Sequence, residues 1–304
     1  MLVLSTRKSR LALWQAEAAR AALTLAHPGL EVELLPVSSS GDQDLSTALS
    51  RFGRIGIFTV EVDAALLDGR AQVGVHSLKD LTTQLEQGLV LGGVLPRGPV
   101  DDALVARDGL TLEELPARAR VATSSQRRKA QLLAARPDLR VVEIRGNVES
   151  RLAKLDAGEA DALLMARAGL ERLDLGERIT EVLDHERFLP AVSQGIVGLT
   201  CRTDDAATQE LLRSLPDDGT LARARAERRF LSTLEAGCTA PLAAHATVDG
   251  DSLHLEARVL SLDGTRSLSG ARAGSTAEPE ALGEALARDL LAQGAAEVVA
   301  EARS

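Results

Sequence analysis

Short apolar runs alternate with amphipathic stretches along the first part of the chain. The apolar runs at residues 1–4, 31–37, 72–76 and 89–95 have the length and composition of strands. Between them, residues 11–25 and 58–67 repeat apolar side chains at helical spacing. Strands that alternate with helices in this way are typical of parallel βαβ units. The pattern therefore predicts an α/β sheet in this part of the chain.

The same alternation starts again near residue 103. Strands are predicted at 103–106, 120–122, 140–144 and 162–166, and helices at 126–135 and 148–156. Residues 196–201 form one more apolar strand, after a loop of small and polar residues. We expect this late strand to return to the first sheet. The chain would then form two α/β lobes that are joined by two crossings.

The pattern changes character near residue 221. A predicted helix at 221–234 leads into a loop of small residues that contains Cys238. Three apolar runs follow at 243–248, 253–262 and 266–273, separated by Asp-Gly pairs that favour hairpin turns. A helix at 279–291 closes a small α+β domain. The predicted fold is therefore α/β with a third small α+β domain: domain 1 at 1–95 plus 196–214, domain 2 at 96–195, and domain 3 at 217–304.

Charge is unevenly distributed along this acidic chain. The formal net charge is −9 over 304 residues, yet residues 121–154 hold eight Lys and Arg against three Asp and Glu, which gives +5. Arginine matches carboxylate and phosphate oxygens with a planar fork of donors. A small ligand with several negative charges is the partner that this stretch predicts. The net charge, with one Trp, four Phe and no Tyr, argues against nucleic-acid binding.

Other classes of protein are also disfavoured. The N-terminus turns polar after four residues, unlike a signal peptide, and no apolar run has the length of a membrane span. Two cysteines give no disulfide framework, so we expect a cytoplasmic location. Five histidines, His27, His76, His185, His245 and His254, lack metal-ligand spacing in the sequence. We therefore expect no membrane partner and no metal.

Three predicted strand-to-helix turns share hydroxyls and basic side chains. They cover residues 5–9, 123–128 and 145–151. In an open sheet such turns gather at the carboxyl ends of the strands, where helix N-termini and arginines make anion sites. The alternative is that each turn only caps its helix, as Thr123 with Gln126 would in a capping box. Three such turns in one chain favour a carboxylate-binding site.

Two further positions are candidates for chemistry. Asp80 follows a buried strand next to Lys79. It is either half of a weak surface ion pair or an ionised carboxylate that stabilises a cationic intermediate. Cys238 is either an exposed loop thiol without a role or a covalent attachment point, because a thiolate adds readily to electrophilic carbon. Cys201 ends an apolar strand and is predicted to be a packed core thiol.

Motifs spread over nearly the whole chain resemble, in the same order, those of the porphobilinogen deaminase (hydroxymethylbilane synthase) family. The matching segments are Ser5-Thr6-Arg7-Lys8-Ser9 with Leu11-Ala12-Leu13-Trp14-Gln15, Gly56-Ile57-Phe58, His76-Ser77-Leu78-Lys79-Asp80, Thr123-Ser124-Ser125-Gln126-Arg127-Arg128, Ile144-Arg145-Gly146-Asn147-Val148, Ala168-Gly169-Leu170-Glu171-Arg172-Leu173, Leu189-Pro190-Ala191-Val192-Ser193-Gln194-Gly195 and Glu235-Ala236-Gly237-Cys238.

The resemblance implies a fold and an activity. It implies two lobes similar to periplasmic binding proteins, with an active-site cleft between them, and a third domain that carries the cofactor-attachment cysteine. The expected cofactor is a dipyrromethane held by a thioether to Cys238. The expected reaction is the head-to-tail condensation of four porphobilinogen molecules with loss of ammonia, followed by hydrolysis to linear hydroxymethylbilane. The resemblance also implies that the protein is a monomer.

The resemblance assigns roles residue by residue. Asp80 matches the catalytic carboxylate. The positions expected to hold the cofactor are Cys238, Lys79, Asp80, Ser125, Arg127, Arg128, Arg145 and Gly146. Those expected to hold substrate are Arg7, Ser9, Arg145, Arg151, Arg172 and Gln194.

The chain departs from the family pattern at four positions. Ile55 stands where a lysine is common, and we expect Arg54 to supply the missing charge. Ser40 replaces a basic residue, Ser193 a glycine and Thr200 a glutamate. A small-anion binding protein with the same two lobes is the competing function, because that fold serves both classes. In that alternative the third domain and its loop cysteine would have no purpose.

Overall fold

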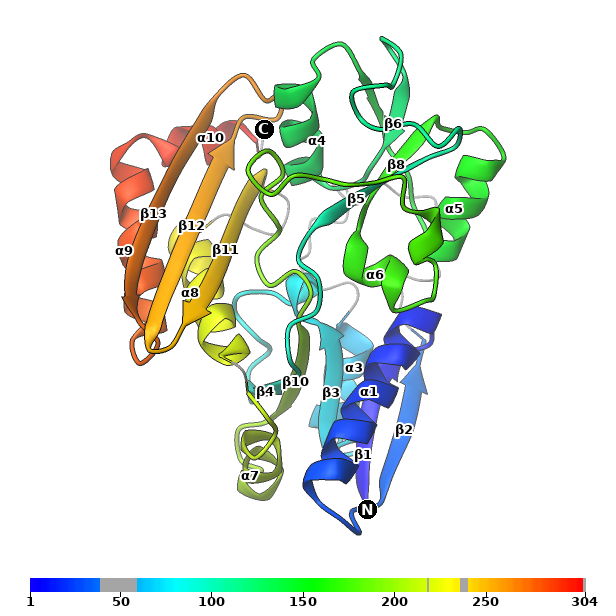
Figure 1. Ribbon diagram of the computed structural model, residues 1–304. Helices are drawn as coiled ribbons and strands as arrows, with labels where there is room; N and C mark the ends of the chain where they lie inside the picture. Colours follow the sequence, from blue (N-terminus) through cyan, green and yellow to red (C-terminus); the bar gives the residue numbers. More distant parts are fainter. Residues whose placement is uncertain (39–58, 218, 236–239, 303–304) are drawn as a thin grey trace. The chain divides into compact units, whose positions relative to one another are not determined.

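The computed structural model describes residues 1–38, 59–217, 219–235 and 240–302. The chain divides into two compact units (Figure 1). Unit 1 comprises Met1–Gly98 and Gly195–Leu221, and unit 2 comprises Pro99–Gln194 and Ala222–Ser304. The predictions made for Ser40, Arg54, Ile55 and Cys238 fall outside the described residues.

Unit 1 contains a five-stranded sheet in the order β2-β1-β3-β10-β4. The strands are β1 (Leu2–Arg7), β2 (Val32–Val37), β3 (Val73–Ser77), β4 (Leu89–Val94) and β10 (Val197–Arg202). β1 is parallel to both β2 and β3, whereas β10 is antiparallel to β3 and β4. The late apolar strand thus returns to the first sheet, as the sequence predicts.

Helices cover the unit 1 sheet. The helices are α1 (Arg10–Ala26), α3 (Val60–Leu67) and α7 (Ala206–Arg213). The main core joins Leu4, Leu23, Leu199 and Leu212, so α1 and α7 pack against strands far apart in the sequence. A second apolar cluster includes Leu66 of α3. Helices and sheet therefore bury apolar surface against one another, and the ends of the strands remain for polar residues.

Unit 2 begins with a second five-stranded sheet, in the order β7-β6-β8-β5-β9. Its strands are β5 (Asp102–Ala106), β6 (Arg120–Ala122), β7 (Arg140–Val142), β8 (Ala162–Ala166) and β9 (Glu181–Val182). β6 is parallel to β7 and β8, and β5 is antiparallel to β8 and β9. The short helices α4 (Gln126–Ala135), α5 (Val148–Asp156) and α6 (Arg167–Glu171) connect or follow the parallel strands.

The C-terminal part is an antiparallel sheet covered by helices. After α8 (Thr220–Thr233) come β11 (Leu242–Asp249), β12 (Ser252–Leu260) and β13 (Ser267–Ser275), in that spatial order. They are followed by α9 (Pro279–Ala292) and α10 (Ala295–Glu301). One apolar cluster, with Phe230, Leu255 and Leu286 at its centre, holds these elements together. The domain boundaries predicted from the sequence stay a prediction.

The structure corrects one expectation about the sheets. The sequence predicts parallel βαβ units, but both five-stranded sheets are mixed. A hydrophobic pattern gives the length and burial of a strand but not its direction, and here each sheet includes strands that enter in reverse. The helices α6, α7 and α10 were also not predicted. No helix within the described ranges is long and apolar enough to cross a bilayer.

Candidate functional site

Two predicted site residues lie where the first strand of unit 1 ends. β1 finishes at Arg7, and Ser9 is the N-cap of α1. The Ser9 hydroxyl accepts a hydrogen bond from the backbone N–H of Ala12 at 3.3 Å. Ser9 therefore caps the helix, which was the alternative to ligand binding for this turn. It also fixes the direction in which the chain leaves Arg7.

Lys79 and Asp80 lie at the end of the neighbouring parallel strand. β3 is followed by a single 3₁₀ turn, Leu78–Asp80, whose Leu78 side chain is completely buried. Asp80 itself is exposed. Because β1 and β3 are adjacent and parallel, both ends lie at one edge of the sheet. The Gln15 amide of α1 also donates to the Ser77 hydroxyl at 2.8 Å. The structure thus brings Arg7, Ser9, Lys79 and Asp80 to one place, which we name the unit 1 edge.

His76, a buried histidine of β3, lies next to the unit 1 edge. Burial lowers the pKa of His76 from 6.5 to about 3, and the charge of Arg7 contributes to the shift. His76 Nε2 lies 3.1 Å from the Thr200 hydroxyl and 3.7 Å from a carboxylate oxygen of Asp63. Burial raises the pKa of Asp63 to about 6. His76 is therefore a neutral, hydrogen-bonded part of the core, and Thr200, where the family pattern has glutamate, is its partner.

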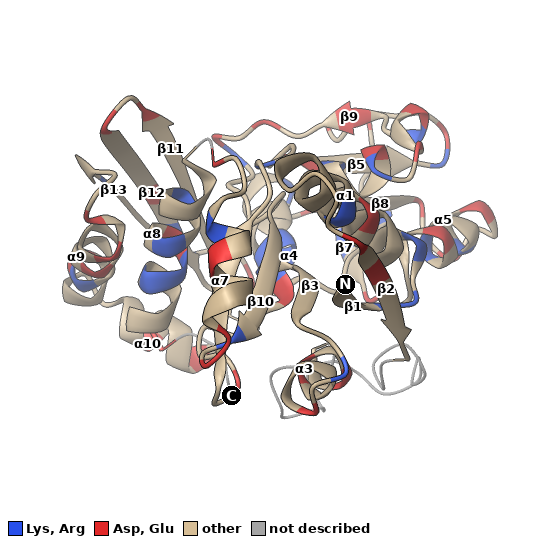
Figure 2. Ribbon diagram, turned by 90° about the horizontal axis from the view of Figure 1, so that it is seen from below, with Lys and Arg blue, Asp and Glu red and all other residues tan. Residues whose placement is uncertain are grey.

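In unit 2, the turn after β6 makes a local cap and a link to the next strand. The N-cap of α4 is Ser125, which accepts from the Arg128 backbone N–H at 3.4 Å. The capping box predicted for Thr123 and Gln126 is therefore wrong. Thr123 instead accepts from the Ser125 N–H at 3.2 Å and donates its own N–H to the Val142 carbonyl at 3.0 Å. Figure 2 shows basic residues of α4 and α8 in blue.

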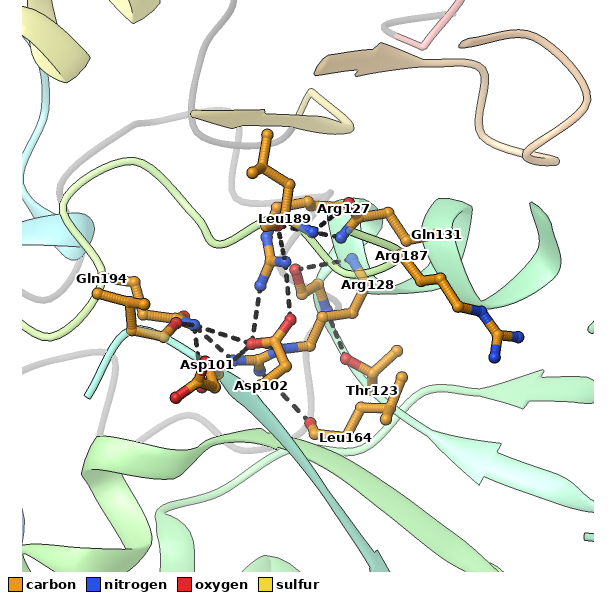
Figure 3. Close-up of polar contacts among 12 residues, drawn as sticks. Asp101, Asp102, Thr123, Arg127, Arg128, Gln131, Leu164, Arg187, Leu189 and Gln194 are labelled. Atoms are coloured by element: carbon orange, nitrogen blue, oxygen red, sulfur yellow. Dashed lines mark hydrogen bonds and ion pairs between the residues drawn. The ribbon is translucent and has the colours of Figure 1, made fainter. Parts of the chain in front are cut away.

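Arg127 and Arg128 surround a buried carboxylate, Asp102 (Figure 3). Arg127 donates to both Asp102 oxygens, at 2.7 and 3.1 Å, and also to the Leu189 carbonyl at 2.7 Å. The Arg128 Nε–H donates to Asp102 at 3.0 Å. The Gln194 amide donates to the same carboxylate at 2.9 Å. Asp102, Arg127, Arg128 and Gln194 form one network, which we name the Asp102 cluster.

The Asp102 cluster keeps an excess of positive charge. Burial alone would raise the pKa of Asp102, but the guanidinium groups of Arg127 and Arg128 outweigh it and hold that pKa far below its usual value. Asp102 is therefore ionised, and the cluster has two guanidinium groups against one carboxylate. A buried charge without a counterion is costly. An anionic ligand close to α4 would offset the remaining charge.

The turn after β7 brings a second group of cations to the same end of this sheet. Its Gly146 has φ +114°, and a Cβ there would lie 2.0 Å from the Ser150 hydroxyl, so only glycine fits. Arg151 donates to the Gly146 carbonyl at 2.8 Å, and Lys154 donates to the Arg145 carbonyl at 3.2 Å. The Arg145 side chain is 13% exposed and lies 3.8 Å from a Glu143 oxygen. The turn therefore concentrates positive charge around a fixed backbone.

Arg172 and Gln194 complete the predicted set in unit 2. Arg172 ends α6, directly after β8, and burial lowers the pKa of its guanidinium. β6, β7 and β8 are parallel, so Arg172 follows the same end of the sheet as the two turns described above. The shared end of these strands, which we name the unit 2 edge, carries Ser125, Arg127, Arg128, Arg145, Gly146, Arg151 and Arg172.

The segment before Gln194 shows the effect of one departure from the family pattern. Ser193 has φ +61°, a left-handed conformation that favours glycine, the residue usual at this position. Its backbone N–H donates to buried Glu227 at 2.6 Å, and no hydrogen-bond partner of its hydroxyl is found among the described residues. The Ser193 turn is thus strained, and Glu227 holds it in place.

The sequence did not predict the role of Asp102. An aspartate at the start of a fully buried strand was the available signal, because a charge at such a position needs partners. The identity of those partners depends on tertiary contacts from α4 and from Gln194. Cys238, the predicted attachment point, lies outside the described residues.

Comparison with known protein families covers nearly the whole chain. Residues 2–210 match the family model described as porphobilinogen deaminase, dipyromethane cofactor binding domain. Residues 221–292 match porphobilinogen deaminase, C-terminal domain.

Individual proteins give the same result. The porphobilinogen deaminase of Moorella thermoacetica is 46% identical over 299 residues, which are 98% of this chain and 96% of the relative. That of Syntrophotalea carbinolica is also 46% identical over 299 residues, 98% of this chain and 95% of the relative. A nutrient binding protein from Burkholderia cenocepacia bound to methionine aligns over 70% of this chain and 90% of its own, with 13% identity and a TM-score of 0.45. That likeness is too weak to add to the architecture described above.

These matches show that the chain is an α/β transferase of tetrapyrrole biosynthesis, with a cofactor-binding domain and a C-terminal domain. The chain belongs to the porphobilinogen deaminase family. It has porphobilinogen deaminase activity, which is that of a hydroxymethylbilane synthase. The resemblance seen in the motifs is confirmed.

Proposed function

We propose that this chain joins four porphobilinogen molecules head to tail, with loss of ammonia, and hydrolyses the product to linear hydroxymethylbilane. Asp80 is the catalytic residue in this proposal. The observation that carries it is the unit 1 edge, where an exposed carboxylate follows β3 and lies at the same end of the sheet as the Arg7 turn. Cationic side chains gathered at strand ends suit a substrate whose ring has two carboxylate arms.

The proposed role of Asp80 is electrostatic. As the C–N bond of the substrate breaks, its electron pair leaves with ammonia and the remaining pyrrole becomes a cation. The α-carbon of a second pyrrole then forms the new C–C bond and loses its proton. An ionised carboxylate near the pyrrole N–H stabilises the positive charge that develops in the first step. Removal of this carboxylate should therefore affect turnover more than binding.

The basic and polar residues are proposed to hold the acidic arms of the ligands. Substrate would contact Arg7, Ser9, Arg145, Arg151, Arg172 and Gln194. The cofactor would contact Lys79, Asp80, Ser125, Arg127, Arg128, Arg145 and Gly146. The excess charge of the Asp102 cluster supports these assignments, because a ligand carboxylate would compensate it. Asp102 limits them, since it already occupies two donor groups of Arg127.

We also propose that Cys238 is the covalent attachment point. The chain has two cysteines, and the other, Cys201, is completely buried in β10. Burial, together with the charge of Asp205, raises the pKa of the Cys201 thiol to about 11, which disfavours the nucleophilic thiolate. Cys238 is then the remaining candidate. The bound dipyrromethane would supply the pyrrole end to which the first substrate unit is joined.

The Asp80 proposal is tested by steady-state kinetics of Asp80→Asn. Each preparation is first checked by intact mass, so that only protein with the same covalent group is compared. We expect kcat to fall by roughly 10²–10³-fold with a much smaller change in KM. Asp68→Asn is the matched control, because Asp68 is an exposed aspartate of unit 1 that forms an ion pair with surface Arg70. Parent-like turnover by Asp80→Asn would exclude the proposed role.

The attachment proposal is tested by the intact mass of the denatured protein. The parent should be heavier than its sequence mass by a group made of two substrate units, and Cys238→Ser should have the sequence mass alone. Cys201→Ala should keep the additional mass. An active parent with the unmodified polypeptide mass would refute the proposal. Monomeric state and cytoplasmic location stay expectations, and light scattering with size exclusion tests the first.

A further inference from the structure

Three side chains far apart in the sequence meet on the outer face of the C-terminal sheet. His185 precedes Phe188 in a loop of unit 2, His245 lies on β11 and Glu256 lies on β12. His185 Nε2 is 2.6 Å from a Glu256 oxygen, and His245 Nδ1 is 3.6 Å from the same oxygen. One donor atom from each residue lies within 4.8 Å of the other two. From these contacts we propose that His185, His245 and Glu256 form a binding site for a divalent transition-metal ion of the zinc type.

The donor set fits such an ion. Two imidazole nitrogens and one carboxylate oxygen are ligands that Zn²⁺ accepts, with a fourth position open to water. Bonds of about 2.0–2.1 Å in a tetrahedral site separate the ligand atoms by roughly 3.3 Å. The observed separations lie on both sides of that value, so small side-chain rotations would bring all three atoms to the ion. The two imidazole rings already lie in a T-shaped arrangement with centroids 4.5 Å apart.

The backbone under each ligand is fixed by contacts that need no metal. His245 and Glu256 are directly opposite one another in the antiparallel register of β11 and β12. The loop of His185 is held by Arg258, whose guanidinium donates to the carbonyls of Glu186 at 2.7 Å and Arg187 at 3.1 Å. Asp184 accepts from the Glu186 N–H at 2.7 Å. The ligands are therefore positioned in advance, which lowers the entropic cost of binding an ion.

Access and charge also favour an ion at this place. The His185 side chain is 31% exposed, that of Glu256 47% and that of His245 12%, so an ion can enter from solvent. Asp184 and Glu186 flank His185 and add negative charge. A hollow of about 350 Å³ adjoins His245 and Glu256 on this side of the sheet. The opposing charges are Arg258, whose guanidinium donates to the carbonyl groups of Glu186 and Arg187, and two further arginines. Arg272 lines the hollow and pairs with Asp289, and Arg187 pairs with Glu113.

An ion at this site would cross-link segments of unit 2. It would link the loop after β9 to two strands of the C-terminal sheet. Metal ions compete with protons for imidazole and carboxylate ligands, so binding should release protons. Sequence spacing could not indicate this site, because His245 is 60 positions after His185 and Glu256 is 11 positions after His245. The site does not depend on the proposed roles of Asp80 or Cys238.

The test is a calorimetric titration of Zn²⁺ into the full-length protein after treatment with a chelator and its removal. The parent should bind one equivalent, with a heat that depends on the buffer as protons are released. His185→Gln and His245→Gln should each weaken binding by at least ~10-fold. His254→Gln is the matched control, since His254 lies on the same strand as Glu256 and its Nε2 lies 3.2 Å from the Ser252 hydroxyl. It should bind as the parent does. Mg²⁺ should bind much more weakly, since it prefers oxygen ligands.

Two further measurements separate a built site from surface binding. Co²⁺ should give the intense visible bands of a tetrahedral site in the parent and lose them in His245→Gln. Zn²⁺ should raise the melting temperature of the parent and of His254→Gln but not that of His185→Gln. Absence of Zn²⁺ binding by the parent, or binding by His185→Gln and His245→Gln that is as tight as that of the parent, would overturn the proposal.

Discussion

The two five-stranded sheets each place an aspartate in a region with basic residues, but the two aspartates differ in burial and in hydrogen bonding. At the unit 1 edge, Asp80 is exposed on a short turn after β3, in the same region as Arg7 and Lys79. In unit 2, Asp102 is completely buried and accepts hydrogen bonds from Arg127, Arg128 and Gln194. The first carboxylate is open to a ligand, and the second has its acceptor positions filled by the protein.

The difference shows how environment decides the use of one side chain. A buried carboxylate with charged donors on all sides orients those donors, and it is costly to remove. An exposed carboxylate contributes little to the fold, so the same residue type is available for chemistry. We infer that Asp102 positions the arginines of α4, whereas Asp80 is the residue proposed to contact the reacting groups. The stability of variants at the two aspartates separates these roles.

The largest expected effect on stability follows Asp102→Asn. This change leaves the guanidinium groups of Arg127 and Arg128 buried without their counterion, and we expect the free energy of unfolding to fall by about 3–5 kcal/mol. Asp80→Asn should change it by less than about 0.5 kcal/mol, because the side chain is exposed. Urea denaturation of both variants with the parent measures the difference. If the two variants were equally stable, the contrast between the aspartates would be wrong.

A medium effect is expected from the pH dependence of His76. Its pKa is about 3 in the folded chain and about 6.5 when unfolded, so between these values the unfolded state binds the additional proton. His76 therefore reduces stability as the pH falls, by about 2 kcal/mol between pH 7 and 5. Asp63 acts in the opposite sense, since its raised pKa lets the folded state bind a proton up to about pH 6.

The variant His76→Gln isolates the first contribution. The stability of the parent relative to the variant should decrease by about 2 kcal/mol when the pH is lowered from 7 to 5. Denaturation curves at the two pH values measure it, and Asp63→Asn should show the opposite trend. A parent-to-variant difference that is the same at both pH values would mean that His76 is not held neutral behind the unit 1 edge.

The smallest effect concerns the turn next to Gln194. Ser193→Gly should raise the free energy of unfolding by about 0.5–1 kcal/mol, since glycine adopts φ +61° without the strain that a Cβ causes. Ser193→Ala is the control, because it removes the hydroxyl but keeps the Cβ, and it should not reproduce the gain. Thermal denaturation of both variants measures this. A glycine variant less stable than the parent would show that the serine turn is not strained.

Local sequence signals predicted much of this architecture. Ser9 and Asn147 were recognisable as polar residues at helix starts, and both are N-caps. The strand at β10 was recognisable from its continuous apolar run. Its direction was not, because an apolar run reads the same in a parallel and an antiparallel strand. Among Thr123, Ser124 and Ser125, all capable of capping, only the backbone geometry selects Ser125.

Tertiary contacts account for what the sequence could not show. The partners of Asp102 come from a helix and a loop that are separated from it by many residues. The meeting of His185 with His245 and Glu256 requires the register of β11 and β12 and a loop from another part of unit 2. The motif resemblance supplied the expected roles of Asp80 and Cys238, which stay predictions. Residue spacing alone left both open.

The burial of Cys201 offers a practical tool for following maturation of the protein. Its sulfur is enclosed in β10, so alkylating reagents should not modify it while the protein remains folded. With two cysteines in the chain, any rapid labelling of the native protein would report Cys238 alone. A simple maleimide titration would then count the molecules in which the second sulfur is still unsubstituted.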